Sequence, residues 1–196
     1  MLAPSNERHF VSVDVGLVGY KARHNLAIVY EDQSRTDLAE QEWRAILAEQ
    51  PQYAPAQVGL IDCLLRRDER EEAATRIEAL RRDPLTAADG FRLAARLVET
   101  QHGASAAIDE LQSGLQKFVD DTGLLRELAR LQHASEDFAA ALATLERLTF
   151  LVPEDASAWH NRGVILGLLN RHEDAQQAFV HLASLRQTRR LPTRIL

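Results

Sequence analysis

The sequence predicts an all-α protein made of five stacked helical hairpins. Apolar and small residues recur along it with a period of about 34 residues, and short polar breaks separate the predicted helices. Outside residues 10–18 there are few β-branched runs, which also favours helices over sheets. A hairpin of this length cannot bury its apolar face alone, so neighbouring copies must stack to form a shared core.

The pattern is clearest near the C-terminal end, in residues 159–179. Trp159, Gly163, Leu166, Ala175 and Phe179 have the spacing of a helix, a turn and a second helix whose small residues allow close approach of the two backbones. This spacing resembles the tetratricopeptide repeat, a helical hairpin of about 34 residues. The resemblance implies a right-handed superhelical solenoid whose concave groove binds a peptide or protein segment.

Taken in order, the chain begins with an N-terminal segment, residues 1–19, that leads into the first helix. Its polar start, with Pro4, Ser5 and Asn6, suggests a loosely attached end. Asp14 is a candidate N-cap, and the apolar stripe that follows it predicts a first helix running to about Asp32.

Five units of equal length follow one another without an insertion: 20–53, 54–87, 88–121, 122–155 and 156–189. Residues 190–196 remain as a basic tail, interpreted as a solvated end. Three columns of residues share one phase and are expected to be buried. They are Ala39, Ala73, Ala107, Ala141 and Ala175; Trp43, Ile77, Leu111, Leu145 and Phe179; and Val29, Cys63, Leu97, Leu131 and Ile165.

The breaks between the two helices of each unit are the polar runs 33–36, 67–70, 101–104, 134–137 and 170–173. Pro51 and Pro153 lie at one phase, just past the second helix of their units, where proline ends a helix. Three residues depart from the repeat pattern and leave packing contacts open: Gly114, Gln132 and Arg162.

The composition of the chain excludes several classes of function. A formal net charge of -6 argues against nucleic acid as the main partner, because phosphate binding requires a basic face. No apolar stretch approaches the roughly 20 residues of a membrane span, and residues 1–18 lack the pattern of a secretory signal. The expected compartment is the cytoplasm. The single cysteine, Cys63, belongs to a buried column and is interpreted as a core residue.

The sequence contains none of the usual enzymatic motifs. It has no glycine-rich phosphate loop, no Gly-x-Ser-x-Gly turn and no His-Glu-x-x-His helix. The seven histidines are scattered, and His172 and His181 are better explained as solvated helix residues than as metal ligands. We therefore expect a protein that is not an enzyme and that uses no cofactor or metal.

The candidate binding residues lie on the first helix of each unit, which lines the groove of a stacked array. In the third and fourth units they are four arginines spaced to share one wall, suited to a carboxylate or phosphate: Arg92, Arg96, Arg126 and Arg130. An alternative is that Glu99 and Glu127 pair with them in surface salt bridges. The first and fifth units add His24, Asn25, His160 and Asn161, whose asparagines could bind a peptide backbone.

The predicted function is therefore a non-catalytic scaffold that binds a peptide or protein segment in its groove, with an acidic segment among the expected ligands. Two alternatives remain open. Residues 15–30 and 39–51 resemble the tetratricopeptide segment that accompanies some bacterial family 2 glycosyltransferases, which implies an accessory region that positions an acceptor. The other alternative is a homo-oligomer that forms through the exposed ends of the array.

Overall fold

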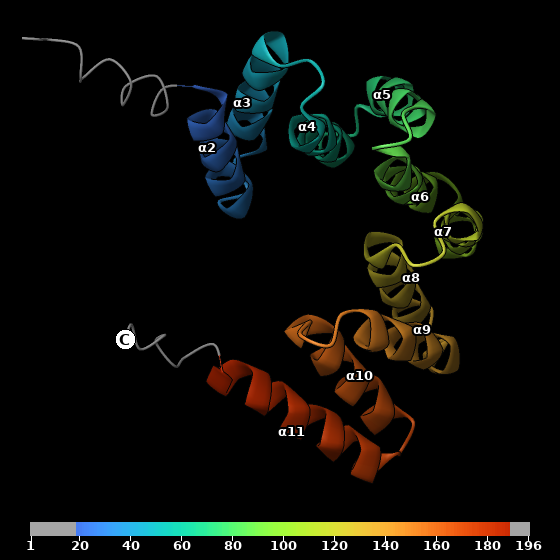
Figure 1. Ribbon diagram of the computed structural model, residues 1–196. Coiled ribbons are helices and arrows are strands. Elements are labelled where there is room, and N and C mark those ends of the chain that lie inside the picture. Colours follow the sequence, from blue (N-terminus) through green and yellow to red (C-terminus); the bar gives the residue numbers. More distant parts are fainter. Residues whose placement is uncertain (1–18, 189–196) are drawn as a thin grey trace, which may run out of the picture. The chain divides into compact units, whose positions relative to one another are not determined.

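The computed structural model describes residues 19–188, which form ten helices and no strand (Figure 1). The all-α fold class predicted from the sequence is confirmed. The helices are α2 (Tyr20–Asp32), α3 (Thr36–Glu49), α4 (Ala54–Arg66), α5 (Arg70–Arg82), α6 (Ala87–His102), α7 (Ala104–Lys117), α8 (Thr122–Ala134), α9 (Phe138–Leu151), α10 (Ala156–Leu168) and α11 (His172–Thr188). The first helix ends at Asp32 as predicted, whereas its expected cap at Asp14 lies outside the described residues.

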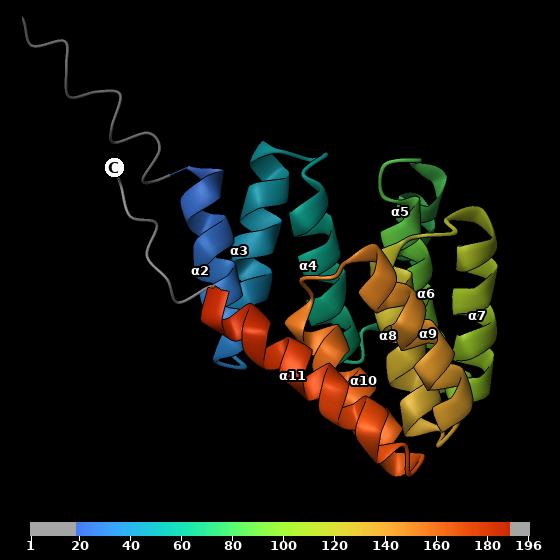
Figure 2. The ribbon, with the colours of Figure 1, turned by 60° about the horizontal axis from the view of Figure 1, so that its bottom comes forward.

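The helices belong to two compact units, one extending to Leu80 and the other starting at Arg81. In the first unit α2 packs against α3, and α3 packs against α4. In the second unit each helix from α6 to α11 packs against the next along the chain, and α6 also contacts α8. Both ribbon views show these neighbours side by side within their unit (Figure 2). None of the described helices is long and apolar enough to cross a membrane.

The core of the second unit consists of two neighbouring clusters. One contains buried residues of α6, α7 and α8, such as Phe91, Leu111 and Leu124. The other joins α8 to α9, α10 and α11, and includes Leu145 and Leu166. Because α8 contributes to both clusters, it holds the third and fourth hairpins of the chain together.

The three predicted columns are buried except for two of their end residues. Every alanine of the first column is at most 6% exposed, and the interior members of the other two are at most 8% exposed. Val29 and Phe179 are the exceptions, at 45% and 40%. The expectation that these two side chains are buried was wrong, because α2 is the first described helix and α11 the last, so each has no further helix against that face.

One turn is repeated between the two helices of a hairpin. Ser34, Asp68, Glu136 and Asn170 share one phase of the repeat and all have φ between 57° and 62°. In each case the next N–H donates to the carbonyl five residues earlier, at 2.8–2.9 Å, which closes the helix end. The hairpin of α6 and α7 uses Gly103 instead, with φ of 85°.

The structure also explains the three departures from the repeat pattern. Gln132 is buried and accepts a hydrogen bond from the Thr144 hydroxyl at 2.7 Å. Gly114 is needed for close packing, since a Cβ there would lie 3.0 Å from Phe91 Cβ. The guanidinium of Arg162 lies 5.0 Å from the ring centre of Trp159, and this cation–π contact replaces an apolar one.

Candidate functional site

Six of the predicted binding residues lie on the first helices of hairpins in the second compact unit, which starts at Arg81. Arg92 and Arg96 lie on α6, Arg126 and Arg130 on α8, and His160 and Asn161 on α10. α6 packs against α8, and α9 packs against both α8 and α10. The arginines of α6 and α8 therefore lie on adjoining helices.

Arg92 joins α6 to the start of α8. Its guanidinium forms an ion pair with Asp89 at 3.2 Å, and only 22% of its side chain is exposed. A Cβ placed on Gly123 would lie 3.7 Å from Arg92 Cδ, so the aliphatic part of Arg92 packs along the backbone of α8. Arg96, one turn further along α6, is half-buried.

Arg126 joins α8 to the start of α10 through Asp155. Its Nε donates to Asp155 Oδ2 at 3.0 Å, and its Nη2 lies 2.7 Å from the same oxygen. The other oxygen, Oδ1, accepts hydrogen bonds from the amides of Ser157 and Ala158 and caps α10. Burial alone would raise the pKa of Asp155, but the hydrogen bonds from Arg126 and the two amides together lower it.

Arg130 has two acidic partners, one on each of the adjoining helices. Its Nη2 lies 2.5 Å from Glu99 of α6 and 2.8 Å from Glu127 of α8. Hydrogen bonding to Glu127 is the largest cause that raises the pKa of Arg130, and Glu99 adds to it. The salt-bridge alternative is therefore what the structure contains at this position.

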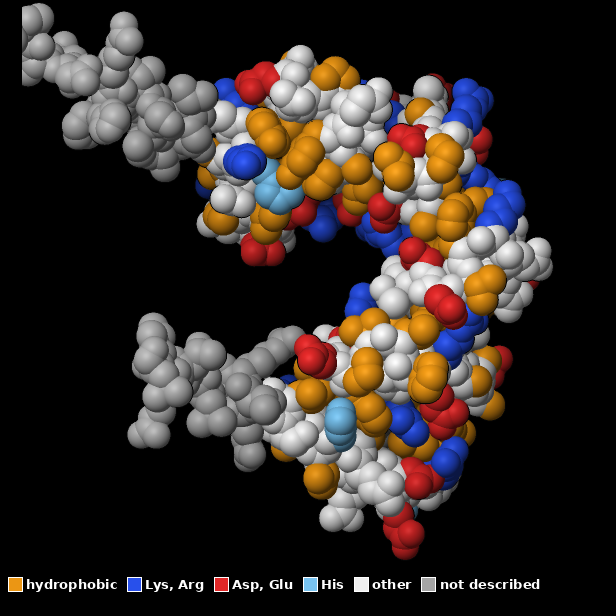
Figure 3. Space-filling view, viewed as in Figure 1, with side chains coloured by type: hydrophobic (Ala, Val, Ile, Leu, Met, Phe, Trp, Pro, Cys, Tyr) orange, Lys and Arg blue, Asp and Glu red, His pale blue; other side chains and the backbone are white. Residues whose placement is uncertain are grey.

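The arginines of this face are charge-compensated. Asp89, Glu99, Glu127 and Asp155 supply four carboxylates among them. The space-filling view shows the same mixture, with basic and acidic side chains alternating over parts of α6 to α9 (Figure 3). An incoming carboxylate would have to displace these acids or be accommodated beside them.

Arg130 and Asn161 both line one small cleft. It has a volume of about 100 Å³ and is lined by Ala129, Arg130, His133, Leu145, Asn161, Val164 and Ile165, from α8, α9 and α10. The side chains of Ala129, Leu145 and Ile165 are buried and form an apolar floor. Asn161 is exposed, and its amide has no hydrogen bond to any residue that the structure describes. The cleft thus combines an apolar floor, one cation and one unused amide.

The remaining predicted residues are not brought to this cleft. The His160 ring lies 6.0 Å from that of Phe179 on α11. In the first unit, His24 is half-buried against α3, with its ring 5.3 Å from that of Trp43. Its Nδ1 is 3.3 Å from the Tyr53 hydroxyl, so His24 contributes to the packing of that unit. Asn25 is exposed on α2.

Sequence reasoning missed His133 and Val164 at the cleft. Val164 could have been found, because it lies one repeat after Arg130 and therefore at the same phase. His133, three residues after Arg130, lies on the same helix face. Nothing in the sequence marked either residue chemically.

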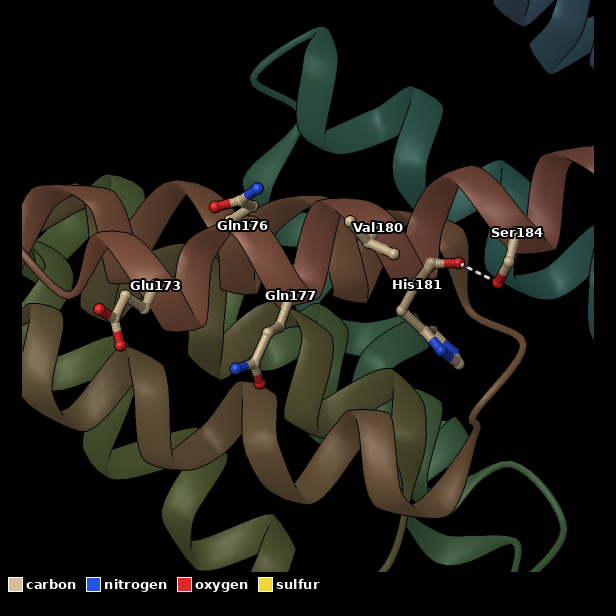
Figure 4. Close-up of a pocket in the computed structure, with 6 residues that line it drawn as sticks. All are labelled: Glu173, Gln176, Gln177, Val180, His181 and Ser184. Atoms are coloured by element: carbon tan, nitrogen blue, oxygen red, sulfur yellow. Dashed lines mark hydrogen bonds between the residues drawn. The ribbon is translucent and has the colours of Figure 1, made fainter.

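A second hollow follows the exposed surface of α11 (Figure 4). It has a volume of about 600 Å³ and is lined by Glu173, Gln176, Gln177, Val180, His181 and Ser184. Beside it, the ring of His181 packs 4.2 Å from that of Trp159. Within residues 19–188, no group of three or more His, Cys, Asp or Glu side chains is placed to hold a metal ion. Burial raises the pKa of Cys63 to about 12, which keeps this thiol protonated.

A family model described as tetratricopeptide repeat matches residues 24–85 and 126–181, more than half of the chain. No curated protein matches the sequence.

Several solved structures are similar in fold. MamA from Desulfovibrio magneticus RS-1 is 11% identical over 88% of this chain and 97% of its own, with a TM-score of 0.58. TTC0263, a thermophilic TPR protein in Thermus thermophilus, is 14% identical over 87% and 96%, with a TM-score of 0.64. YrrB, described as a TPR protein with an unusual peptide-binding site, is 16% identical over 92% and 93%, with a TM-score of 0.52. At these identities the likeness concerns the fold alone.

Proposed function

Because the chain belongs to the tetratricopeptide repeat family, we propose that it is a non-catalytic scaffold that binds an extended peptide or protein segment on the first helices of the second unit. The observation that carries the proposal is the cleft between α8 and α10, where the unused amide of Asn161 lies beside Arg130 above an apolar floor. An asparagine amide can both donate to and accept from a peptide backbone, whatever the peptide sequence.

The size of the cleft limits what it accepts. At about 100 Å³ it is well below the roughly 300–1,000 Å³ of small-molecule pockets. It suits one small aliphatic side chain of a longer ligand. The apolar floor would hold that side chain, and Asn161 would fix the backbone next to it.

The charges around Arg130 indicate what net charge the ligand should have at this point. Arg130 already contacts Glu99 and Glu127, so a carboxylate that approaches it also meets two negative charges. We therefore favour a ligand segment that is neutral or of mixed charge at this point. The acidic ligand expected from the sequence stays a prediction, and charge reversal tests it: Arg92→Glu with Arg126→Glu weakens binding of an acidic peptide without reducing helicity.

The test begins with the selection, from a peptide library, of peptides that bind the full chain. The best peptide is then measured by fluorescence anisotropy against wild type, Asn161→Ala and the control Gln112→Ala, an exposed amide on α7. Loss of two hydrogen bonds to Asn161, at about 1 kcal/mol each, predicts binding weaker by about 30-fold. The control is expected to bind like wild type. Equal affinity of the Asn161→Ala variant would refute the proposed site.

Self-association is a second candidate function, favoured by the exposure of Phe179 and Val180 on α11 at 40% and 63%. Two copies could bury this surface against each other. Light scattering over a range of concentrations tests it, with Val180→Glu as the disrupting variant. A monomer at every concentration would exclude this function.

The accessory role beside a family 2 glycosyltransferase is supported by the resemblance of residues 15–30 and 39–51. Its test is genetic: an aspartate-rich α/β transferase domain encoded upstream in the same reading frame, or by a neighbouring gene, would favour it. The absence of both would leave the independent scaffold as the better proposal.

A further inference from the structure

Two exposed residues, Val29 and Phe179, occupy repeat positions whose counterparts pack together inside the array. Leu145 of α9 and Ile165 of α10 belong to one buried cluster and line the same cleft. They are only 2% and 1% exposed. Phe179 lies one repeat after Leu145, and Val29 lies four repeats before Ile165. The exposed face of α11 therefore corresponds to one half of the α9–α10 contact, and that of α2 to the other half.

A second pair of exposed residues corresponds to an ion pair between α9 and α10. Nη2 of Arg162 on α10 lies 3.6 Å from Oε1 of Glu146 on α9. The counterpart of Glu146 one repeat later is Val180, which is 63% exposed. The counterpart of Arg162 on α2 is Leu26, which is 39% exposed. α11 and α2 thus carry apolar residues where α9 and α10 carry opposite charges.

The polar edge of the same two faces is also compatible. Arg67, which follows α4, forms an ion pair with Asp37 of α3. The counterparts of these two residues are Gln33, which follows α2, and Glu173 of α11. A glutamine amide can donate a hydrogen bond to a carboxylate, so no like charges oppose each other at this point. Glu173 and Val180 both line the hollow of about 600 Å³ that follows α11 (Figure 4).

We propose that copies of this chain associate head to tail, with α11 of one copy packed on α2 of the next. Phe179 and Val180 of the first copy cover Val29 and Leu26 of the second, as α9 packs on α10 within the chain. The inference rests on the self-association proposed above and names the surface that α11 meets, which is α2 of the next copy and not a second α11.

A second copy is the favoured occupant because the chain itself carries both halves of the contact. Three contacts between neighbouring hairpins have counterparts on α11 and α2, all in one register of the repeat. A symmetric pair of α11 helices would cover Phe179 and Val180 but leave Leu26 and Val29 exposed. A head-to-tail contact covers all four. Because such a contact is heterologous, association continues beyond a dimer unless it closes into a ring.

Crosslinking between two single-cysteine chains tests the contact in the full-length protein. Both chains carry Cys63→Ala, one has Leu26→Cys and the other has Val180→Cys. After mixing and treatment with a short bis-maleimide, we expect crosslinked dimers that contain one chain of each kind. The control replaces Leu26→Cys by Gln41→Cys, an exposed position on α3. Crosslinking of the Val180→Cys chain mainly to itself, or equal yields with the control, would overturn the proposal.

A charge exchange tests the same contact with Cys63 in place. Leu26→Arg and Val180→Glu each bury an unpaired charge, so each alone should weaken association by at least about tenfold. Together in one chain they recreate the interior pair of Arg162 with Glu146 at every contact, and association should recover. Light scattering over a range of concentrations measures the association of all four proteins.

The outcomes separate this inference from the self-association on which it rests. A wild-type mass that does not rise with concentration would exclude self-association itself, and the head-to-tail contact with it. A rising mass that Leu26→Arg leaves unchanged would exclude only the head-to-tail contact, because a symmetric pair of α11 helices does not involve α2. A double variant that associates no better than Val180→Glu alone would also overturn the proposal.

Discussion

Replacing Glu136 by glycine should stabilise the second unit, although it removes a side chain. Glu136 lies in the turn between α8 and α9 with φ of 60°, a left-handed conformation that costs an L residue about 1–2 kcal/mol. Its side chain is exposed. Glycine relieves the strain but loses about 0.5–1 kcal/mol through the greater entropy of the unfolded chain. The difference between these two ranges gives an expected net gain of up to about 1.5 kcal/mol.

The assay is urea unfolding followed by the fluorescence of Trp159, in a Trp43→Phe background so that the second unit alone is reported. A matched control is Ala143→Gly, at an exposed position within α9, which should cost about 1 kcal/mol. Asn170→Gly should gain less than Glu136→Gly, because asparagine tolerates the left-handed conformation. If Glu136→Gly destabilised as much as Ala143→Gly does, the explanation of the repeated turn would be wrong.

Two further predictions concern the first unit. Gly59→Ala should destabilise it by about 1–3 kcal/mol, because the new Cβ would lie 2.4 Å from the Trp43 ring. Chemical denaturation measures this loss. A smaller loss would mean that α3 and α4 separate easily. The pKa of Glu72 is lowered to about 2, first by the hydrogen bond from Arg44 and then by Arg76. The stabilisation that the ionised Glu72 gives to the fold is therefore complete above pH 4.5 and is lost as the pH falls towards 2. Because the pair with Arg44 is partly exposed, we expect this stabilisation to be about 1 kcal/mol. Glu72→Gln should weaken the pH dependence of the free energy of unfolding between about pH 5 and 2. An unchanged pH dependence would show that other carboxylates cause it.

The helices could be predicted because their signal is periodic and local. The repeating columns fall on described helices, and four of the polar breaks contain the repeated turn at Ser34, Asp68, Glu136 and Asn170. The exposure of Val29 could not be predicted from its column, because burial depends on a neighbouring helix and the sequence of one column does not reveal whether that helix exists.

The candidate site was predicted only in part. The phase placed Arg130 and Asn161 on first helices, but the cleft between them depends on how α8, α9 and α10 pack. The pairing of Arg126 with Asp155 was also missed. Asp155 has a local task as the cap of α10, and its second contact crosses 29 residues of sequence. The ring contacts of His24 arise from Trp43 and Tyr53, on other segments.

The side-chain amide of Asn161 can be observed by nitrogen-15 NMR and assigned from the signal that disappears in Asn161→Ala. During titration with the selected peptide, we predict that this signal shifts and that its protons exchange more slowly with water, because the amide gains hydrogen bonds to the peptide backbone. Saturation of the protein by the peptide with the Asn161 signal unmoved, while signals elsewhere shift, would contradict binding at the α8–α10 cleft.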